Sequence, residues 1–463
     1  MQKAIAKYGL AAHLALLAVA PLFLFPFYGA PAIASVLLWL SLAGAWWILL
    51  EPSLRGGEML HDARRRVWRS VWRDPLFWVF LAVAAMAGAR ALNTGIVMAY
   101  DFETRAWAVS PPSIPMVSGS HADAGVLPFA AAVALGVVVT GCRHAMGRSA
   151  RMAFLLLSSS LSGMAAVMLI LLADGGDKVA NAAISCGPAW LYCPGVTFAL
   201  FLLCGTVALY GAFDRGWNVA VTLALFAVGG NAAGLFAFSP AFDVVVFAGA
   251  EALLFVAVFA AACRSLRGSG EFRMLVVFSI ALVLGALLVV AVLPEDVVSG
   301  KVAPITSMDF LPADMLERRR VLSAAAFKAW VAHPWAGVGM GAFQFHLRFC
   351  VAAADWSLIP QGTAAVPNGW WQLLVERGIV GAVAMALPLC LMVATYFRRA
   401  AGCVRARRFP GPTVLVAPLA ILALAATAFF DCSLLRPDAL VAAGAMLSVS
   451  AKSFPKEMIR GNG

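Results

Sequence analysis

The stretch 152–172, MAFLLLSSSLSGMAAVMLILL, contains no charged residue over its whole length. A helix of about 20 apolar residues crosses the hydrocarbon core of a bilayer, so this stretch is long enough to span a membrane. The run 196–212, VTFALFLLCGTVALYGA, follows it with the same character. Unbroken apolar runs exclude a membrane β-barrel, whose strands alternate between apolar and polar residues.

The composition extends this pattern to most of the 463 residues. Hydrophobic residues make up 62% of the chain and charged residues 12%, whereas a soluble globular protein carries about 25% charged residues. Further apolar runs lie near 8–29, 30–50, 75–93, 125–141, 218–239, 241–263, 274–294, 378–397, 413–431 and 436–450. We therefore expect an all-α polytopic membrane protein with about 12 transmembrane helices.

The formal net charge of +11 comes from basic residues in alternate loops. These loops contain, among others, Lys3, Lys7, Arg64, Arg65, Arg66, Arg143, Arg148, Arg264, Arg398 and Arg399. Cytoplasmic loops of membrane proteins are enriched in Lys and Arg, so both termini are predicted to be cytoplasmic. The basic stretch 61–73 favours a topology anchor beside anionic lipid. The chain shows no zinc-ligand spacing and no basic helix with interleaved aromatics, so nucleic acid is not an expected partner.

The helices divide the chain into three regions. Residues 1–294 form an N-terminal region of nine predicted helices, 295–366 a long outer loop between spans 9 and 10, and 367–463 a C-terminal region of three helices. A loop of this length in a compact protein is usually functional. Within it, 321–332 predicts a short amphipathic helix lying on the bilayer surface.

Two cysteines, Cys186 and Cys193, lie close together in the predicted outer loop 173–195. Prolines at 188 and 194 favour a bend there, so the pair is a disulfide candidate. The alternative is two small apolar residues packed at the membrane surface.

The long loop contains the densest group of polar residues. Arg318, Arg319 and Arg320 are adjacent, and a guanidinium group binds phosphate oxygens in a bidentate manner. A lipid-linked pyrophosphate is therefore a natural target. The alternative is a solvated cluster in which the arginines pair with Glu317 and Asp314.

Three alternating glycines, Gly337, Gly339 and Gly341, follow His333-Pro334. No strand precedes them and no Lys-Ser/Thr follows, which excludes the common nucleotide-binding loops. They favour tight turns in which one backbone segment approaches another closely.

The segment 319–381 resembles the core of the O-antigen ligase and O-antigen polymerase superfamily of bacterial envelope glycosyltransferases. In that family an arginine precedes a short helix that ends in His-Pro, followed by Gly-x-Gly-x-Gly-x-Phe; Arg319 and HPWAGVGMGAF (333–343) fit this pattern. Asn368, nine further residues and Gly-x-x-Gly fit the next element, with QLLVERGIVG at 372–381. The family's layout of spans with one long periplasmic loop also agrees with the whole chain.

The resemblance implies glycosyl transfer at the periplasmic face of the bacterial inner membrane, without metal or nucleotide cofactor. The donor would be a glycan on undecaprenyl pyrophosphate, and the acceptor a second glycan or the lipid A-core of lipopolysaccharide. Arg319 and Arg320 would stabilise the leaving pyrophosphate. Residues expected to contact substrate are Arg318, His333, Asn368, Trp370 and Trp371.

The chain departs from the family pattern at one important position. Pro367 stands where the family has a histidine that activates the acceptor hydroxyl, and a proline side chain cannot accept a proton. His346, in the same loop, is the candidate replacement. Two other functional classes stay open. One is a polysaccharide flippase or transporter, for which Glu251 is the clearest intramembrane carboxylate. The other is an inactive family member that serves as an assembly scaffold.

Overall fold

The structure is a computed structural model. It describes residues 2–24, 36–48 except 38, 68–82 except 75 and 79, 98–101, 106–109, 126–174, 194–213, 218–265, 313–339, 343–359, 366–405, 412–430 and 437–450. Two predictions, the span at 274–294 and the pair formed by Cys186 and Cys193, lie outside these residues.

The described chain is helical apart from one small hairpin. Its main helices are α1 (Gln2–Leu24), α5 (Val126–Ala145), α6 (Arg148–Asp174), α8 (Gly195–Phe213), α9 (Asn218–Phe238), α10 (Ala241–Ser265), α13 (Ala313–Ala332), α14 (Phe343–Cys350), α15 (Gly369–Arg405), α16 (Pro412–Thr427) and α17 (Pro437–Ser450). A short 3₁₀ helix, η4, covers Ala353–Leu358, and helical residues also occur within 36–48 and 68–82. Strands β1 (Met98–Asp101) and β2 (Ala106–Val109) pair antiparallel, with Met98 opposite Val109.

Three helices in the described chain are long and apolar enough to cross a membrane: Ser149–Leu172, Gly195–Ala212 and Asn218–Phe238. Shorter apolar helical stretches occur at Tyr8–Leu24, Val133–His144 and Leu415–Thr427. The two runs that first indicated a membrane protein thus form α6 and α8. These features are those of a multi-pass membrane protein.

Helix α8 packs against five other helices of the bundle. It is apolar on every side, and Phe198, Leu200 and Phe201 are completely buried. A helix that is hydrophobic all round is expected to be enclosed by other helices. Accordingly, α8 contacts α6, α9, α10, α16 and α17, and its side chains form the centre of the bundle core.

Helices α6 and α9 approach closely because both carry small residues at their crossing. A Cβ added to Gly230 would lie 2.7 Å from the backbone oxygen of Gly163. Beside this contact, Ser162 donates a hydrogen bond of 2.7 Å to the side-chain oxygen of Asn231, which is fully buried. Asn231 donates in turn to the backbone oxygens of Ser159 and Ala227, each at 2.8 Å. Small residues and interhelical hydrogen bonds are the usual means of association inside a bilayer.

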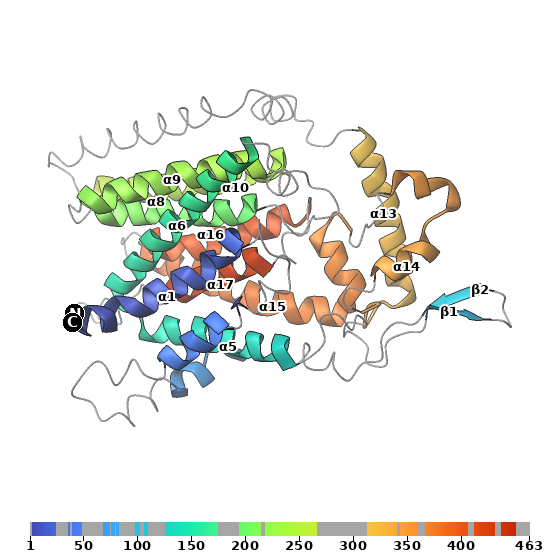
Figure 1. Cartoon of the computed structure of the whole chain (residues 1–463), viewed down its shortest axis with the longest axis horizontal. Helices are drawn as coiled ribbons and strands as arrows, with labels where there is room; N and C mark the ends of the chain where they lie inside the picture. The colour runs from blue at the N-terminus through green and yellow to red at the C-terminus, as the bar shows by residue number, and fades with distance from the viewer. Residues whose placement is uncertain are drawn as a thin grey trace.

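A second, smaller core lies outside the bundle core. It is formed by Leu322, Ala325, Ala326, Ala329, Val338, Phe343, Leu347, Ile359, Val366 and Val375. These residues come from α13 and the turn after it, from α14, from the segment around η4, and from α15 and the residues just before it. Figure 1 shows α13, α14 and the hairpin at one end of the long axis, with the start of α1 at the other.

We predict that Gly230→Ala destabilises the bundle, because the new methyl group meets the backbone of α6, which cannot rotate away. Overpacking of this kind costs about 1–3 kcal/mol. Gly249→Ala on α10 is the matched control, since a Cβ there meets nothing within 4 Å. Thermal unfolding in detergent should show a lowered midpoint for Gly230→Ala alone. Equal midpoints for the two variants would contradict the close crossing of α6 and α9.

Candidate functional site

The three adjacent arginines lie in the first half of α13, which begins at Ala313, ahead of the predicted start at 321. The buried face of this helix carries Leu322, Ala325, Ala326 and Ala329. Residues three or four positions apart share a helix face, so Arg318 and Arg319 lie on the same side as Leu322. Both are half-buried, whereas Arg320 is exposed. The structure therefore turns two of the three arginines inward.

Arg319 connects α13 to the bundle. Its Nη2 donates a hydrogen bond to the backbone oxygen of Phe430, in the turn that follows α16, and its guanidinium carbon lies 5.8 Å from the centroid of the Phe430 ring. The C-terminal end of a helix carries partial negative charge, so a cation is favourable there. The Phe430 ring also lies 3.5 Å, centroid to centroid, from that of Phe242 on α10. Sequence reasoning did not find Phe430, because nothing in its local sequence marks it.

Arg318 and Arg320 have no hydrogen bond or ion pair within the described chain. Glu317, the expected acidic neighbour, is exposed and pairs with neither of them; the side chain of Asp314 lies outside the description. The Nε atom of Arg318 is buried without a hydrogen-bond partner. Arg318 therefore has guanidinium donors that an anionic ligand can occupy.

Helix α15 is interrupted at Gly378, whose φ of 63° and ψ of −174° are not helical. The turn after α13 supplies hydrogen-bond partners for the backbone groups of α15 near this break. Val338 and Gly339 donate to the backbone oxygens of Val375 and Glu376, at 2.8 and 3.0 Å. In the other direction, Ile379 and Val380 donate to the oxygens of Pro334 and Trp335, at 2.9 and 3.3 Å. We call this arrangement of residues 334–339 and 375–380 the interlock.

Glycine is required on both sides of the interlock. Gly337 has φ 71° and Gly378 has φ 63°, in the left-handed region that other residues rarely adopt. A Cβ on Gly337 would lie 2.5 Å from the backbone nitrogen of Gly378, and one on Gly378 would collide with the backbone oxygen of Trp335. The prediction that the glycines allow close backbone approach is confirmed for Gly337, while Gly341 lies outside the described residues.

A buried polar chain lies on the α15 side of the interlock. The Gln372 side chain accepts a hydrogen bond from the Val366 amide at 2.7 Å and donates one to Glu376 at 2.6 Å. Gln372 is 2% and Glu376 5% exposed. Sequence reasoning treated these two residues only as part of a motif. Their spacing of four residues on one helix was the available signal.

Asn368, Trp370 and Trp371 surround the start of α15. The side-chain oxygen of Asn368 accepts hydrogen bonds from the amides of Trp370 and Trp371, each at 3.0 Å, which is the usual role of an N-cap residue. The Trp370 indole donates to the backbone oxygen of Ala425 at 3.0 Å. The Trp371 ring lies 6.3 Å from that of Trp330, edge to face. These three of the five residues expected to contact substrate thus make contacts within the protein.

His333 and His346 lie together beside the interlock. Their rings are 6.0 Å apart, edge to face; His333, at the end of α13, is exposed and His346, on α14, is half-buried. The Nε2 atom of His346 is buried and has no hydrogen-bond partner among the residues that the structure describes. Burial, and secondarily the nearby His333, lower the pKa of His346 below its ordinary value. Both effects favour the neutral imidazole, the form that can accept a proton.

The described residues contain no group of three or more His, Cys, Asp or Glu placed to hold a metal ion. Comparison of the chain with protein-family models, with curated proteins and with solved structures finds no match. The functional interpretation therefore depends on the motif residues and on their geometry.

We predict that Gly378→Ala disrupts the interlock, because alanine is strained at this φ by about 1–2 kcal/mol and its methyl group meets Trp335. The control is Gly402→Ala in the same helix, where a Cβ meets nothing within 4 Å and alanine favours the helix. Limited proteolysis should cut Gly378→Ala faster than the control within 333–342. Equal cutting would show that the two segments do not depend on each other.

Proposed function

We propose that this chain is a membrane glycosyltransferase of the O-antigen ligase or polymerase type. It transfers or polymerises a glycan carried on undecaprenyl pyrophosphate, in the biosynthesis of surface polysaccharide. The proposal includes a layout of about 12 spans, cytoplasmic termini, and a long periplasmic loop over 295–366 between spans 9 and 10. It places the protein in the bacterial inner membrane.

The interlock is the observation that carries the proposal. The sequence elements behind the family resemblance are Arg319, the segment 333–343 and the segment 368–381, which are separated along the chain. In the structure, residues from all three belong to one unit built from α13, its following turn and the start of α15. Motif residues that meet in space favour a shared function over chance similarity of short sequences.

The arginines of α13 suit a reaction with a pyrophosphate leaving group. The acceptor hydroxyl oxygen attacks the anomeric carbon, the bond from that carbon to the pyrophosphate oxygen breaks, and the hydroxyl proton passes to a base. Negative charge then develops on the pyrophosphate, and Arg318 has the unoccupied donors to stabilise it. Arg319 holds α13 in position through Phe430, and Arg320 adds positive charge at the surface.

His346 is the proposed proton acceptor in place of the histidine that Pro367 replaces. Its Nε2 atom has no hydrogen bond, and its lowered pKa keeps the ring neutral. A neutral base is lost as the pH falls through its pKa, so the acid limb of the rate profile should lie below pH about 6.5. If the chain is instead an inactive scaffold, His346 has no effect on polysaccharide.

A transporter is the second candidate, supported by one buried contact. Thr206 of α8 donates a hydrogen bond to Glu251 of α10 within the bundle. Ionisable residues inside a membrane commonly mark a transport pathway. The assay is movement of glycan or lipid-linked substrate across the membrane of vesicles. Movement that depends on a proton gradient, and that is lost in Glu251→Gln, would favour this candidate over glycosyl transfer.

The proposed function predicts that Arg318→Gln slows glycan transfer by about one to two orders of magnitude, since a hydrogen bond to a charged group contributes about 1.5–3 kcal/mol. Its folding should be little affected, because Arg318 makes no hydrogen bond or ion pair with the described residues. Arg348→Gln, an exposed arginine of α14, is the control. The measurement is transfer from lipid-linked glycan by purified protein, with gel analysis of the product.

His346→Ala should slow the same reaction comparably and remove the acid limb. Wild-type transfer in both variants would exclude this active centre. The scaffold hypothesis makes a different prediction. The wild-type protein would then transfer nothing, its deletion would alter surface polysaccharide in cells, and the Arg318 and His346 variants would leave the polysaccharide unchanged.

A further inference from the structure

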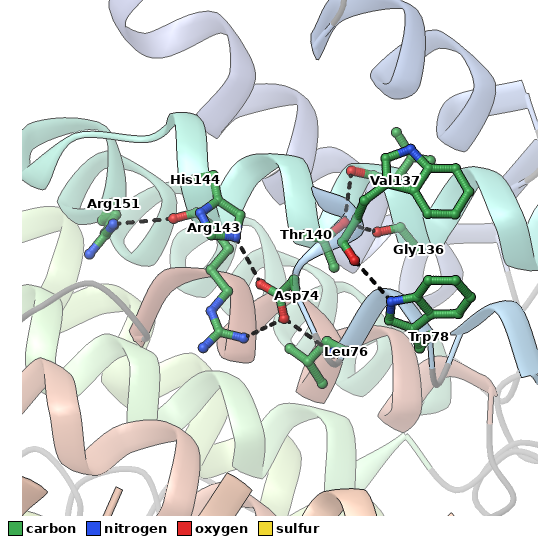
Figure 2. Close-up of polar contacts among 10 residues, drawn as sticks. Asp74, Leu76, Trp78, Gly136, Val137, Thr140, Arg143, His144 and Arg151 are labelled. Carbon is green, nitrogen blue, oxygen red and sulfur yellow. Dashed lines mark hydrogen bonds and ion pairs between the residues drawn. The ribbon is translucent and has the colours of Figure 1, made fainter. Parts of the chain in front are cut away.

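A second polar cluster lies where α5 ends and α6 begins (Figure 2). Asp74, 4% exposed, accepts hydrogen bonds from Arg143 Nη1 at 3.0 Å, from His144 Nε2 at 2.9 Å and from the Leu76 amide at 3.1 Å. Burial alone would raise the pKa of Asp74, but the His144 hydrogen bond and the charge of Arg143 outweigh it and hold the pKa below its usual value. Asp74 is an ionised carboxylate whose contacts are already taken.

Arg151 lies beside this cluster and forms no ion pair with any acidic side chain that the structure describes. It is only 8% exposed. Its Nη2 donates one long hydrogen bond, 3.5 Å, to the backbone oxygen of Arg143, and its Nε is buried without a partner. Leaving a buried guanidinium unpaired is strongly unfavourable, and such a group in a native structure indicates a missing ligand or ion.

The described charges around Arg151 do not balance. Arg143 pairs with the Asp74 carboxylate, whereas Arg151 donates to the backbone oxygen of Arg143. His144 adds hydrogen-bond donors but no negative charge. Among the described residues, the positive charge of Arg151 is therefore matched by no carboxylate.

The position of Arg151 indicates what kind of anion is available. It stands two residues after Ser149, where the apolar span Ser149–Leu172 begins, and so lies at the depth of the lipid headgroups. On the neighbouring segment, Trp72 and Trp78 are each 50% exposed and their ring centroids are 5.5 Å apart. Exposed tryptophans of this kind gather at the membrane–water interface.

We propose that Arg151 binds the phosphate of an anionic membrane phospholipid. Guanidinium groups bind phosphate oxygens through paired hydrogen bonds, and basic pockets between membrane helices recognise anionic headgroups. The lipid phosphate supplies the negative charge that the cluster lacks. Asp74 holds Arg143 in place while leaving Arg151 to the lipid. This site is separate from the interlock and does not depend on the proposed glycosyl transfer.

The test compares the wild type, Arg151→Met and Arg73→Met in lipid-depleted detergent. Arg73 is an exposed arginine on the neighbouring segment, so its variant controls for general attraction to anionic lipid. Native mass spectrometry measures retention of phosphatidylglycerol and of phosphatidylcholine, and thermal unfolding measures the effect of each lipid and of inorganic phosphate on Tm.

The wild type and Arg73→Met should prefer phosphatidylglycerol, which should raise their Tm. Arg151→Met should bind it about tenfold more weakly or worse and lose the rise in Tm. Without lipid, Arg151→Met should be at least as stable as the wild type, because an unpaired charge has been removed. Unchanged phosphatidylglycerol binding, a full response of the wild type to inorganic phosphate alone, or an unfolded Arg151→Met protein would each overturn the proposal.

Discussion

The break at Gly378 leaves backbone donors and acceptors of α15 without their helical partners, and the turn after α13 supplies partners for four of them. A buried backbone group without a hydrogen bond is costly, so neither segment holds its conformation without the other. This contact positions the segments that carry the second core, the two inward arginines and the two histidines. Gly337 and Gly378 make it possible because each leaves room for the other backbone.

The interlock also explains how a polar unit is joined to an apolar bundle. Helix α15 begins beside α13, continues past the break through a long apolar stretch, and ends at Arg405. At its start, Gly369 donates to the backbone oxygen of Ala428 at 2.7 Å, close to the place where Arg319 meets Phe430. The turn that follows α16 is thus held by both α13 and α15. Arg319 thus connects α13 to the bundle, whereas Arg318 makes no hydrogen bond or ion pair with the described residues.

The sequence predicted the apolar helices well, because a span such as α6 or α9 is defined by its own composition. It also predicted close backbone approach at Gly337. It could not show that the partner is Gly378, about 40 residues away, since that pairing depends on how α13 and α15 pack. The sequence did not predict the start of α13, because its residues are polar. It did not predict the hairpin of β1 and β2, because the strands are short. Asn368 carried a recognisable N-cap signal, yet was assigned to substrate.

Hydrogen–deuterium exchange of the detergent-solubilised protein tests the interlock most directly. The amides of Val338, Gly339, Ile379 and Val380 should exchange slowly and as a group, because each donates to the opposite segment. Peptides covering 333–339 and 376–381 should then lose protection together as denaturant is added. Fast exchange at 338–339 alongside a fully protected 379–380, or the reverse, would contradict the mutual dependence on which the proposed site is built.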